Sequence, residues 1–382
     1  MHIKHLSLTN FRNYIRLELD LPPRLTLIQG DNAQGKTNLL EAIYFLATTR
    51  PLHARMDSQL INWSAQRDEM PFARVVADIQ RGDAPHRVEI TLIKTPKPEA
   101  GRLRKRIKVD GVERRALDLI GLVNVVIFSP QDLELISGPP QLRRHYLNAT
   151  ICQIDPRYCR ALNRYNRILR QRNYLLRQLQ ERHGDPDQLA FWDEGLIEEG
   201  TYIIAQRQET LTELNELIHE THLRLTGGKE RLNLVYQPSI KFTTEQRIEE
   251  AFAEQLSQVR AKEIQRGLSL LGPHRDDVRF FADDVDMNVY ASRGQRRTIA
   301  LSLRLAEMGL MRSRTGEQPI LLLDDVMSEL DRDRRQHLMA AIGEEQQAII
   351  TTTDLDRFSP HFLARVRLLR VQEGKIESMT ND

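Results

Sequence analysis

One eight-residue stretch near the N-terminus restricts the possible folds more than any other part of this 382-residue chain. It fits the pattern G-x-x-x-x-G-K-[ST] and consists of Gly30, Asp31, Asn32, Ala33, Gln34, Gly35, Lys36 and Thr37. Residues 25–28 before it are typical of a buried strand, and residues 38–46 after it are typical of an amphipathic helix. This order directs backbone N–H groups and a helix N-terminus at one point, where a polyphosphate fits. The stretch predicts a nucleoside triphosphate site in which Lys36 reaches the β- and γ-phosphates and the Thr37 hydroxyl ligates Mg²⁺.

The composition is that of an ordinary globular protein, with 40% hydrophobic and 28% charged residues. No apolar run is long enough to cross a bilayer, and the first residues alternate as in a strand rather than forming a signal peptide. The two cysteines, Cys152 and Cys159, are expected to be buried and unpaired. These features predict a cytoplasmic protein without a membrane partner.

The charge is nearly balanced overall, at +2, but unevenly distributed. Arginines crowd residues 157–182, and acidic residues crowd residues 193–220. Two antiparallel helices that brace each other are slightly favoured over a DNA-binding face. A second basic cluster, residues 102–108, precedes the turn at Asp110-Gly111. It indicates either a solvated hairpin or a strand that contacts a phosphate backbone.

Strand and helix patterns divide the chain into an α/β part and a helical insert. Strands are predicted at 72–80 and 88–93, joined through residues 81–83, and at 123–128; residues 131–265 are predicted to be helical. Strand character returns at 278–290, followed by a helix at 294–312, strands at 320–323 and 348–351, and an edge strand that turns at 373–374. The predicted domains are therefore 1–130 with 305–382, and 131–304. This division requires residues 30–37 to lie beside Asp324 and Asp325.

Two acids follow the apolar run Ile320–Leu323, as in a buried parallel strand that ends at the ligand edge of a sheet. Asp324 is expected to hold Mg²⁺ through water, and Asp325 to orient or deprotonate the attacking water. Taken alone, the two acids also suit a helix N-cap.

Residues 291–297 open a long predicted helix, and Ser292 with Gln295 fits a capping box. The same helix start is a candidate second anion site. Because the chain has a single phosphate loop, this second site is expected to serve a partner's triphosphate.

Together these motifs resemble the ATPase head of the ABC class, in the DNA-repair group that contains the structural-maintenance-of-chromosomes and Rad-fifty-type proteins. The resemblance implies an α/β fold: an ABC-type P-loop ATPase head with a mixed sheet and an inserted, mostly α-helical lobe. Walker A is residues 30–37, Walker B is residues 320–324, and the D-loop is residues 328–331. The signature motif consists of Ser292, Arg293, Gly294 and Gln295.

The resemblance also assigns roles to single residues. Gln131 matches the Q-loop, which implies a part in Mg²⁺ binding and catalysis, and Arg12 and Asn13 match an N-terminal motif that approaches the nucleotide. Asp325 stands where the class usually has Glu, and its shorter side chain fits slow hydrolysis. Thr353 falls at the switch position usually held by His; it can hydrogen-bond the γ-phosphate but cannot carry a proton at neutral pH.

Residues 272–277, Gly-Pro-His-Arg-Asp-Asp, narrow the resemblance to one bacterial family of recombination mediators and extend it over nearly the whole chain. It implies a weak DNA-dependent ATPase that forms a homodimer around two ATP molecules with Mg²⁺. It further implies binding to single-stranded DNA, gaps or junctions, with roles in recombinase loading, DNA repair, replication restart and SOS induction. The implied partners are the recombination proteins RecR and RecO and, indirectly, the recombinase.

Three other interpretations remain. Chromosome-condensing heads carry hundreds of coiled-coil residues at this place, whereas this insert has about 130 to 170 and can form only a lobe. The alternative is therefore a chromosome-maintenance ATPase of this group without a long coiled coil. A transporter ATPase would need a membrane partner, for which the chain gives no special evidence. A DNA clamp switched by ATP, with incidental hydrolysis, is not excluded. In every DNA-binding interpretation, the small net charge predicts salt-sensitive contacts to the backbone without base recognition.

Overall fold

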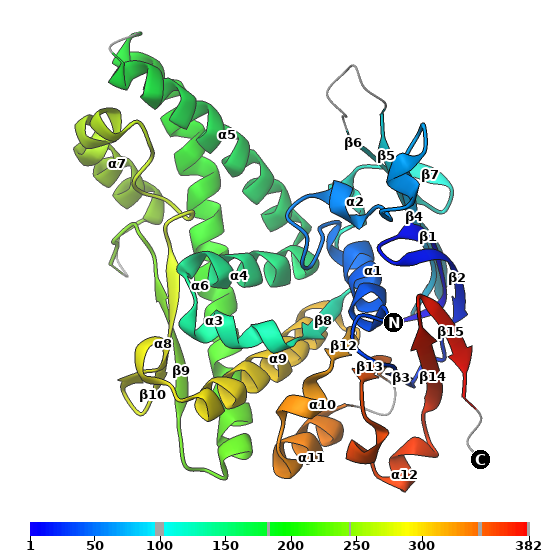
Figure 1. Cartoon of the computed structure of the whole chain (residues 1–382). Coiled ribbons are helices and arrows are strands. Elements are labelled where there is room, and N and C mark those ends of the chain that lie inside the picture. Colours follow the sequence, from blue (N-terminus) through cyan, green and yellow to red (C-terminus); the bar gives the residue numbers. More distant parts are fainter. Residues whose placement is uncertain (96–102, 182–183, 244–245, 343–345, 380–382) are drawn as a thin grey trace. The chain divides into compact units, whose positions relative to one another are not determined.

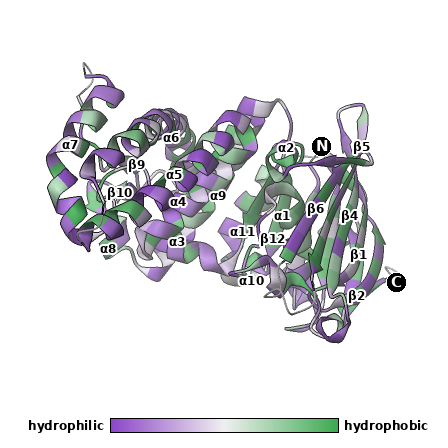
Figure 2. Ribbon diagram, turned by 90° about the horizontal axis from the view of Figure 1, so that it is seen from above, coloured by the Kyte–Doolittle hydropathy of each residue, from purple (hydrophilic) through white to green (hydrophobic). Residues whose placement is uncertain are grey.

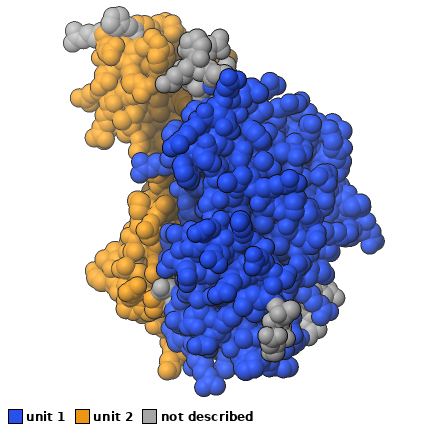
Figure 3. Space-filling view, turned by 45° about the vertical axis from the view of Figure 1, so that its right-hand side comes forward, with its two compact units in different colours: residues 1–132, 300–382 blue, residues 133–299 orange. Residues whose placement is uncertain are grey.

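The computed structural model describes residues 1–95, 103–181, 184–243, 246–342 and 346–379. The chain divides into two compact units, coloured separately in Figure 3. Unit 1 contains residues 1–132 and 300–382, and unit 2 contains residues 133–299. The predicted boundaries differ from these by at most five residues.

Unit 1 contains a six-stranded mixed sheet that is built from both ends of the chain (Figure 1). Its strands, in spatial order, are β15 (Lys375–Ser378), β14 (Arg367–Gln372), β3 (Leu25–Gln29), β13 (Ala348–Thr352), β12 (Ile320–Asp324) and β8 (Val125–Phe128). All neighbours are parallel except the β14–β15 hairpin. Strands β8, β12 and β13 are buried along their whole length, as expected for a parallel sheet covered on both faces. Because β3 and β12 flank β13, their carboxyl ends lie near each other at one edge.

A second, antiparallel sheet completes unit 1. Its strands, in order, are β2 (Tyr14–Asp20), β1 (His2–Phe11), β4 (Phe72–Arg81), β5 (Ala84–Lys94), β6 (Leu103–Val109) and β7 (Val112–Arg114). The predicted β4–β5 hairpin is confirmed, and so is the turn at Asp110-Gly111, where both residues have positive φ. Inward-facing apolar residues of this sheet share one core with helix α1 (Lys36–Thr48) and with the mixed sheet. Figure 2 shows the hydrophobic residues gathered along α1 and these strands.

Shorter helices complete unit 1: α2 (Ala116–Leu119), α10 (Val326–Glu329), α11 (Arg332–Ala341) and α12 (Pro360–Leu363). The long helix α9 (Arg293–Thr315) begins in unit 2 and continues into unit 1. In unit 1, Arg304 on this helix forms a 2.6 Å ion pair with Asp132, which directly follows the β8 strand region. Because α9 covers residues 293–315, the helix predicted at 294–312 is confirmed.

Unit 2 is mostly helical. Its helices are α3 (Leu133–Ser137), α4 (Pro140–Ile154), α5 (Pro156–Gln180), α6 (Leu189–Thr226), α7 (Ile248–Arg266) and α8 (Met287–Tyr290). The arginine-rich α5 and the acidic α6 follow each other and are joined by ion pairs, Arg164 with Glu199 at 3.0 Å and Arg172 with Asp193 at 2.7 Å. These pairs support the bracing interpretation for the two charged segments.

Two details of the predicted secondary structure in unit 2 are wrong. Residues 232–237 are strand β9 rather than helix, and β9 pairs with β10 (Asp277–Ala282), which in turn pairs with β11 (Val285–Asp286). The alternation of buried Leu232 and Leu234 with exposed neighbours has the period of a strand. The strand predicted to continue to residue 290 ends at 286, because the Asp286 side chain caps helix α8 by accepting the backbone N–H of Asn288.

Cys152 and Cys159 are buried and form no disulfide, as predicted. Among the described residues, no helix is both long enough and apolar enough to span a membrane.

Candidate nucleotide-binding site

The glycine loop joins β3 to α1, and its backbone leaves no room for larger residues. Gly35 has φ +122°, a value that favours glycine, and a Cβ atom there would lie 2.6 Å from the side-chain nitrogen of Asn13. At Gly30 a Cβ atom would lie 2.6 Å from the carbonyl oxygen of Val371. Helix α1 begins directly after Gly35, so its first N–H groups face the loop. The strand, loop and helix predicted from residues 25–46 are therefore confirmed.

Neighbouring turns hold the loop in place through its carbonyl groups. The Tyr14 hydroxyl donates to the Gly35 carbonyl at 3.0 Å, and the Asn13 side chain donates to the Gln34 carbonyl at 2.9 Å. The backbone N–H of Gly374, in the turn between β14 and β15, donates to the same Gln34 carbonyl at 3.1 Å. These bonds fix the loop backbone. The Gly30 N–H donates to the Thr352 carbonyl at 3.1 Å, which leaves the later loop residues and the first turn of α1 to offer N–H groups to an anion.

Lys36 is buried within the loop that it follows. Its Nζ donates to the carbonyl oxygens of Gly30 at 2.5 Å and Asp31 at 2.8 Å. Burial lowers the pKa of Lys36, and the nearby carboxylates of Asp325 and Asp324 act in the opposite direction. The ammonium group of Lys36 is thus held at the loop by hydrogen bonds to two backbone carbonyl groups. The nearby carboxylates offset only part of the cost of burying its charge.

Asp324 and Thr37 meet although they are 287 residues apart in the sequence. The Thr37 hydroxyl lies 3.0 and 2.9 Å from the two carboxylate oxygens of Asp324. One of these oxygens, Oδ1, also accepts a 3.0 Å hydrogen bond from the buried hydroxyl of Thr351 on β13. The parallel order β3–β13–β12 brings these three residues to one edge of the sheet.

The oxygen atoms of Thr37 and Asp324 suit Mg²⁺, which prefers hard oxygen ligands and retains several waters. In the described parts of the chain, no group of three or more His, Cys, Asp or Glu side chains could hold a metal ion by itself. A magnesium ion at this position would therefore depend on phosphate and water oxygens for most of its ligands. Such a site fits a metal that arrives with a nucleotide.

Asp325 has an unusual environment for a carboxylate. Its φ is +51°, and its backbone N–H donates to the Thr351 hydroxyl at 3.0 Å. The Thr353 backbone N–H interacts with its carboxylate, yet its buried Oδ1 has no hydrogen-bond partner among the described residues. Burial raises the pKa of Asp325, an effect that the positive charge of Lys36 opposes. A half-buried carboxylate with a raised pKa is suited to exchange a proton with water.

The helix N-cap alternative does not explain Asp325. Asp325 directly precedes α10, but the Asp325 side chain forms no capping hydrogen bond. The capping role belongs to Asp331, whose side chain accepts the Arg334 N–H at the start of α11.

Three other residues of unit 1 were predicted to belong to the nucleotide site; two of them follow strands of the mixed sheet, and the third contacts helix α1. Thr353 directly follows β13 and contacts Asp325. Gln131 is exposed in the turn after β8, the strand that pairs with β12. Arg12 instead forms an ion pair with the buried Glu41 of α1, at 2.7 Å, and its guanidinium also donates to the Gln59 carbonyl. The nucleotide-contacting role predicted for Arg12 remains untested.

Residues 292–295 belong to unit 2 and form the predicted capping box. The Ser292 hydroxyl accepts the Gln295 N–H at 3.2 Å, and the Gln295 side chain accepts the Ser292 N–H at 3.0 Å. Ser292, Arg293 and Gly294 are exposed. The capping box predicted for this segment is therefore confirmed. Its contact with a partner's triphosphate stays a prediction.

The sequence prediction missed Thr351 and Tyr14 as supports of the site. Thr351 is fully buried and links Asp324 to Asp325. A hydroxyl residue within the apolar strand 348–352 was the available signal, because a buried hydroxyl needs a hydrogen-bond partner.

Comparison with known proteins identifies the family. The family model described as RecF/RecN/SMC N terminal domain matches residues 2–376. A protein of Chloroflexus aurantiacus called DNA replication and repair protein RecF is 45% identical over 98% of this chain and 99% of its own length. A RecF of Roseiflexus castenholzii is 44% identical with the same coverage.

Solved structures give the same result. A structure of the recombination mediator protein RecF with ATP, in the RecFOR pathway, superposes with a TM-score of 0.87 at 32% identity and covers 99% of this chain and 98% of that one. An Smc head, at 16% identity, has a TM-score of 0.54 over 100% of this chain and 99% of that one, and it supports the ABC/SMC-type fold alone. By the family model and by these full-length relatives, this chain belongs to the RecF family.

Proposed function

We propose that this chain is an ATP-dependent, DNA-binding recombination mediator that hydrolyses ATP slowly. The supporting observation is the meeting of Thr37 with Asp324 beside Lys36, at the carboxyl edge of a parallel sheet. ATP binding is supported by the RecF relative solved with ATP, which covers nearly the whole chain. The loop N–H groups and Lys36 would bind the β- and γ-phosphates, so that Lys36 would exchange its contacts to Gly30 and Asp31 for phosphate oxygens.

In the proposed mechanism, Thr37 and Asp324 hold Mg²⁺. When bound, the ion neutralises negative charge on the β- and γ-phosphates. Asp325 would orient the attacking water through its carboxylate, and Gln131 and Thr353 would approach the γ-phosphate from the ends of the two strands that flank β12. The water gives its proton to Asp325 or to a phosphate oxygen as the bond to the γ-phosphorus forms and the bond to the ADP oxygen breaks. The shorter arm of Asp, compared with Glu, suits a slow reaction that times the release of a complex.

The proposal includes a dimer around two ATP molecules. The capping box uses the N–H groups of Ser292 and Gln295. Ser292, Arg293 and Gly294 are nevertheless exposed, so the Ser292 O–H and the N–H groups of Arg293 and Gly294 are the donors that this segment would offer to a second copy. In this arrangement the helix start of one protomer would contact the γ-phosphate held by its partner. Formation of the dimer on DNA gaps or junctions would support recombinase loading with RecR and RecO, and thereby repair, replication restart and SOS induction.

The test of the shared site is the dependence of activity on concentration. If each site needs a partner's residues 292–295, ATPase activity per molecule rises as the protein concentration passes through the dimer dissociation constant. Activity per molecule that stays constant while sedimentation shows only monomers would reject the shared site.

A variant separates ATP binding from dimerisation. Ser292→Arg places a bulky cation where the partner's γ-phosphate would lie, so we expect ATP affinity within about twofold of the parent and loss of the ATP-induced dimer. The matched control is Ser257→Arg, at an exposed position of α7 in the same unit. An ATP-induced dimer of parental strength in Ser292→Arg would refute the proposed contact.

A further inference from the structure

Unit 2 contains a pocket of about 280 Å³ that is unrelated to the nucleotide loop. It lies between helices α4, α5 and α6 and the segment before β10, which contains the Gly-Pro-His-Arg-Asp-Asp motif. This volume is close to the lower end of the ~300–1,000 Å³ typical of small-molecule sites. It is much larger than the ~30 Å³ occupied by one water.

The polar lining of this pocket consists of two arginines, two histidines, three amides and one tyrosine. It includes Gln141, Arg144, His145, Asn148, Asn166 and His274. No Asp or Glu of the described chain contributes to the lining. Leu142, Leu162 and Pro273 add an apolar portion. The lining therefore suits a ligand with an anionic group and an organic part.

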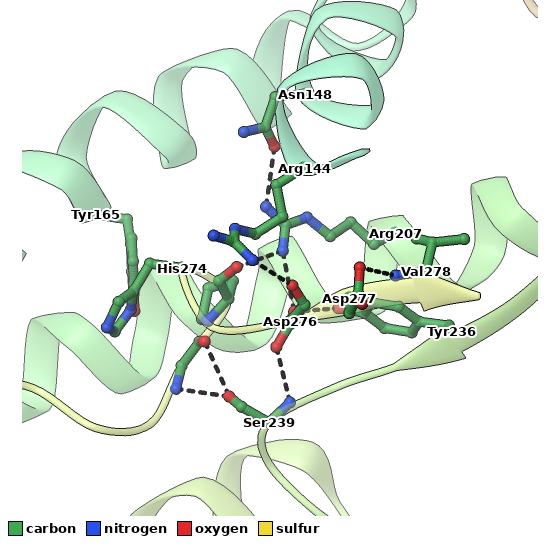
Figure 4. Close-up of polar contacts among 12 residues, drawn as sticks. Arg144, Asn148, Tyr165, Arg207, Tyr236, Ser239, His274, Asp276, Asp277 and Val278 are labelled. Carbon is green, nitrogen blue, oxygen red and sulfur yellow. Dashed lines mark hydrogen bonds and ion pairs between the residues drawn. The ribbon is translucent and has the colours of Figure 1, made fainter. Parts of the chain in front are cut away.

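Behind the pocket, polar side chains and backbone groups form a network of hydrogen bonds with one another (Figure 4). Buried Asp276 accepts hydrogen bonds from Arg207 at 2.9 Å, from the Tyr236 hydroxyl at 2.5 Å and from the Ser239 N–H at 2.8 Å. Arg207 also donates to the Pro273 carbonyl at 2.6 Å. The charge of Arg207 is thus compensated, and its donors are committed to the protein.

Arg144 differs from the other inward-facing arginines of unit 2. Its preceding neighbour Arg143 is paired with Asp277 at 2.7 and 2.9 Å, and Arg172 is paired with Asp193 and Glu263, each at 2.7 Å. Among the described residues, the one hydrogen bond of the Arg144 guanidinium goes to a backbone oxygen, that of Asp276, at 2.7 Å, and it has no carboxylate within ion-pair distance. The bond fixes the guanidinium at the pocket and leaves other N–H donors for a ligand.

The burial of Arg144 and the charges around it also favour a bound anion. The pKa of Arg144 is lowered, chiefly by burial and then by the positive charge of Arg207, although Asp277 and Asp276 act against this. A half-buried cation without a paired carboxylate gains from a bound anion, because the anion supplies the missing countercharge in a partly dehydrated site.

We propose that this pocket binds a nucleotide through its phosphate group, with Arg144 as the main phosphate ligand. A guanidinium fork matches phosphate oxygens, and the amides of Gln141 and Asn166 offer both donors and acceptors. The Asn148 amide offers its N–H donors, because its oxygen already accepts from Tyr158 and Arg207. The apolar wall accommodates a sugar or base. A carboxylate side chain of a protein partner would fill only a small part of the volume. The nucleotide is either free or the 5′-phosphorylated end of a DNA strand.

Calorimetric titration of the full chain tests this pocket. The background is Lys36→Met, which removes phosphate binding at the loop of unit 1, and the probe is deoxyadenosine 5′-monophosphate. We expect Arg144→Gln to weaken binding at least tenfold and Arg144→Lys to weaken it less. Arg160→Gln, at an exposed position of α5 that does not line the pocket, should leave binding unchanged. Equal affinity in Arg144→Gln and its parent would overturn the proposal, as would no binding of the probe or its binding only in the presence of an intact Lys36.

A second variant covers the possibility that Arg144→Gln disturbs folding. Asn166→Asp adds a carboxylate to the pocket wall without removing the Arg144 contact and should also weaken binding at least tenfold. Unchanged affinity in this variant, with an unchanged melting temperature, contradicts the proposal.

Two DNA duplexes that differ only in a 5′-phosphate or a 5′-hydroxyl identify the source of the phosphate. A preference for the phosphorylated end that depends on Arg144 supports a DNA terminus, whereas binding of the mononucleotide without this preference supports a free nucleotide. Arg144-dependent binding of an acidic peptide, with no binding of either phosphate probe, rejects the nucleotide. Because the background lacks Lys36, these results are independent of the ATP site proposed for unit 1.

Discussion

The hydroxyl of Thr351 provides a sharp test of how the two acids after β12 are held. Thr351 is fully buried; it donates to Asp324 and accepts the backbone N–H of Asp325, both at 3.0 Å. Thr351→Val keeps the shape of the side chain but removes these two bonds and the 3.3 Å contact of the hydroxyl with the Leu323 carbonyl. A hydrogen bond to a charged group contributes about 1.5–3 kcal/mol, and leaving a buried donor unpaired costs about 1–3 kcal/mol. We therefore expect a loss of about 2.5–6 kcal/mol in the free energy of unfolding.

Thr351→Ser is the matched control, because it keeps the hydroxyl and removes one buried methyl group, at a cost of about 1 kcal/mol. Urea unfolding followed by circular dichroism measures both variants, with stability compared through the midpoint and slope. ATP affinity should fall in the Val variant and change little in the Ser variant, since Asp324 loses its orienting contact only in the former. A Val variant that is as stable as the Ser variant and binds ATP equally well would refute the reasoning.

Two further predictions concern backbone strain and a buried imidazole. Gly272→Ala should cost more than about 2 kcal/mol, because φ is +121° and a Cβ atom would lie 2.2 Å from the Tyr165 hydroxyl oxygen. Gly111→Ala, with positive φ but no atom within 4 Å, should cost about 1 kcal/mol, and equal unfolding midpoints for the two would be contrary evidence. Burial lowers the pKa of His274 to about 4, so its contribution to stability is complete above about pH 6.5 and falls by roughly 3 kcal/mol as the pH drops toward 4. His274→Gln should flatten the unfolding profile in this window, and an unchanged profile would contradict the buried neutral imidazole. The groups that face His274 are Tyr165, Ser269, Arg144, Arg172 and Arg275.

The glycine loop of residues 30–37 and the strand β12 could be predicted because their signals are local. Residues 30–37 fix a strand–loop–helix unit by their spacing, and the four apolar residues before Asp324 can only be accommodated in a strand covered on both faces. The need for two distant segments to share one magnesium ion then required residues 30–37 and 324 to meet. The 2.9 Å distance between Thr37 and Asp324 confirms that requirement.

The remaining features depend on contacts that no local pattern contains. The partner of Arg12 is Glu41, on a helix whose sequence offers several polar residues, so the ion pair could not be identified in advance. Strand β9 is short and follows a 38-residue helix, and it is stabilised by pairing with β10 about 45 residues later. The network around Asp276 joins residues from α6, β9 and the Gly-Pro-His-Arg-Asp-Asp segment, which only the tertiary structure brings together.

Sedimentation velocity of Asp325→Asn, with and without ATP and Mg²⁺, tests whether the nucleotide at residues 30–37 joins two protomers. The variant keeps Lys36, Thr37 and Asp324 for binding but lacks the carboxylate that would orient water. We predict that ATP converts it into a long-lived dimer that hydrolyses ATP far more slowly than the parent. A variant that binds ATP, remains monomeric at every concentration and hydrolyses ATP at the parental rate would contradict both the shared site and the role of Asp325.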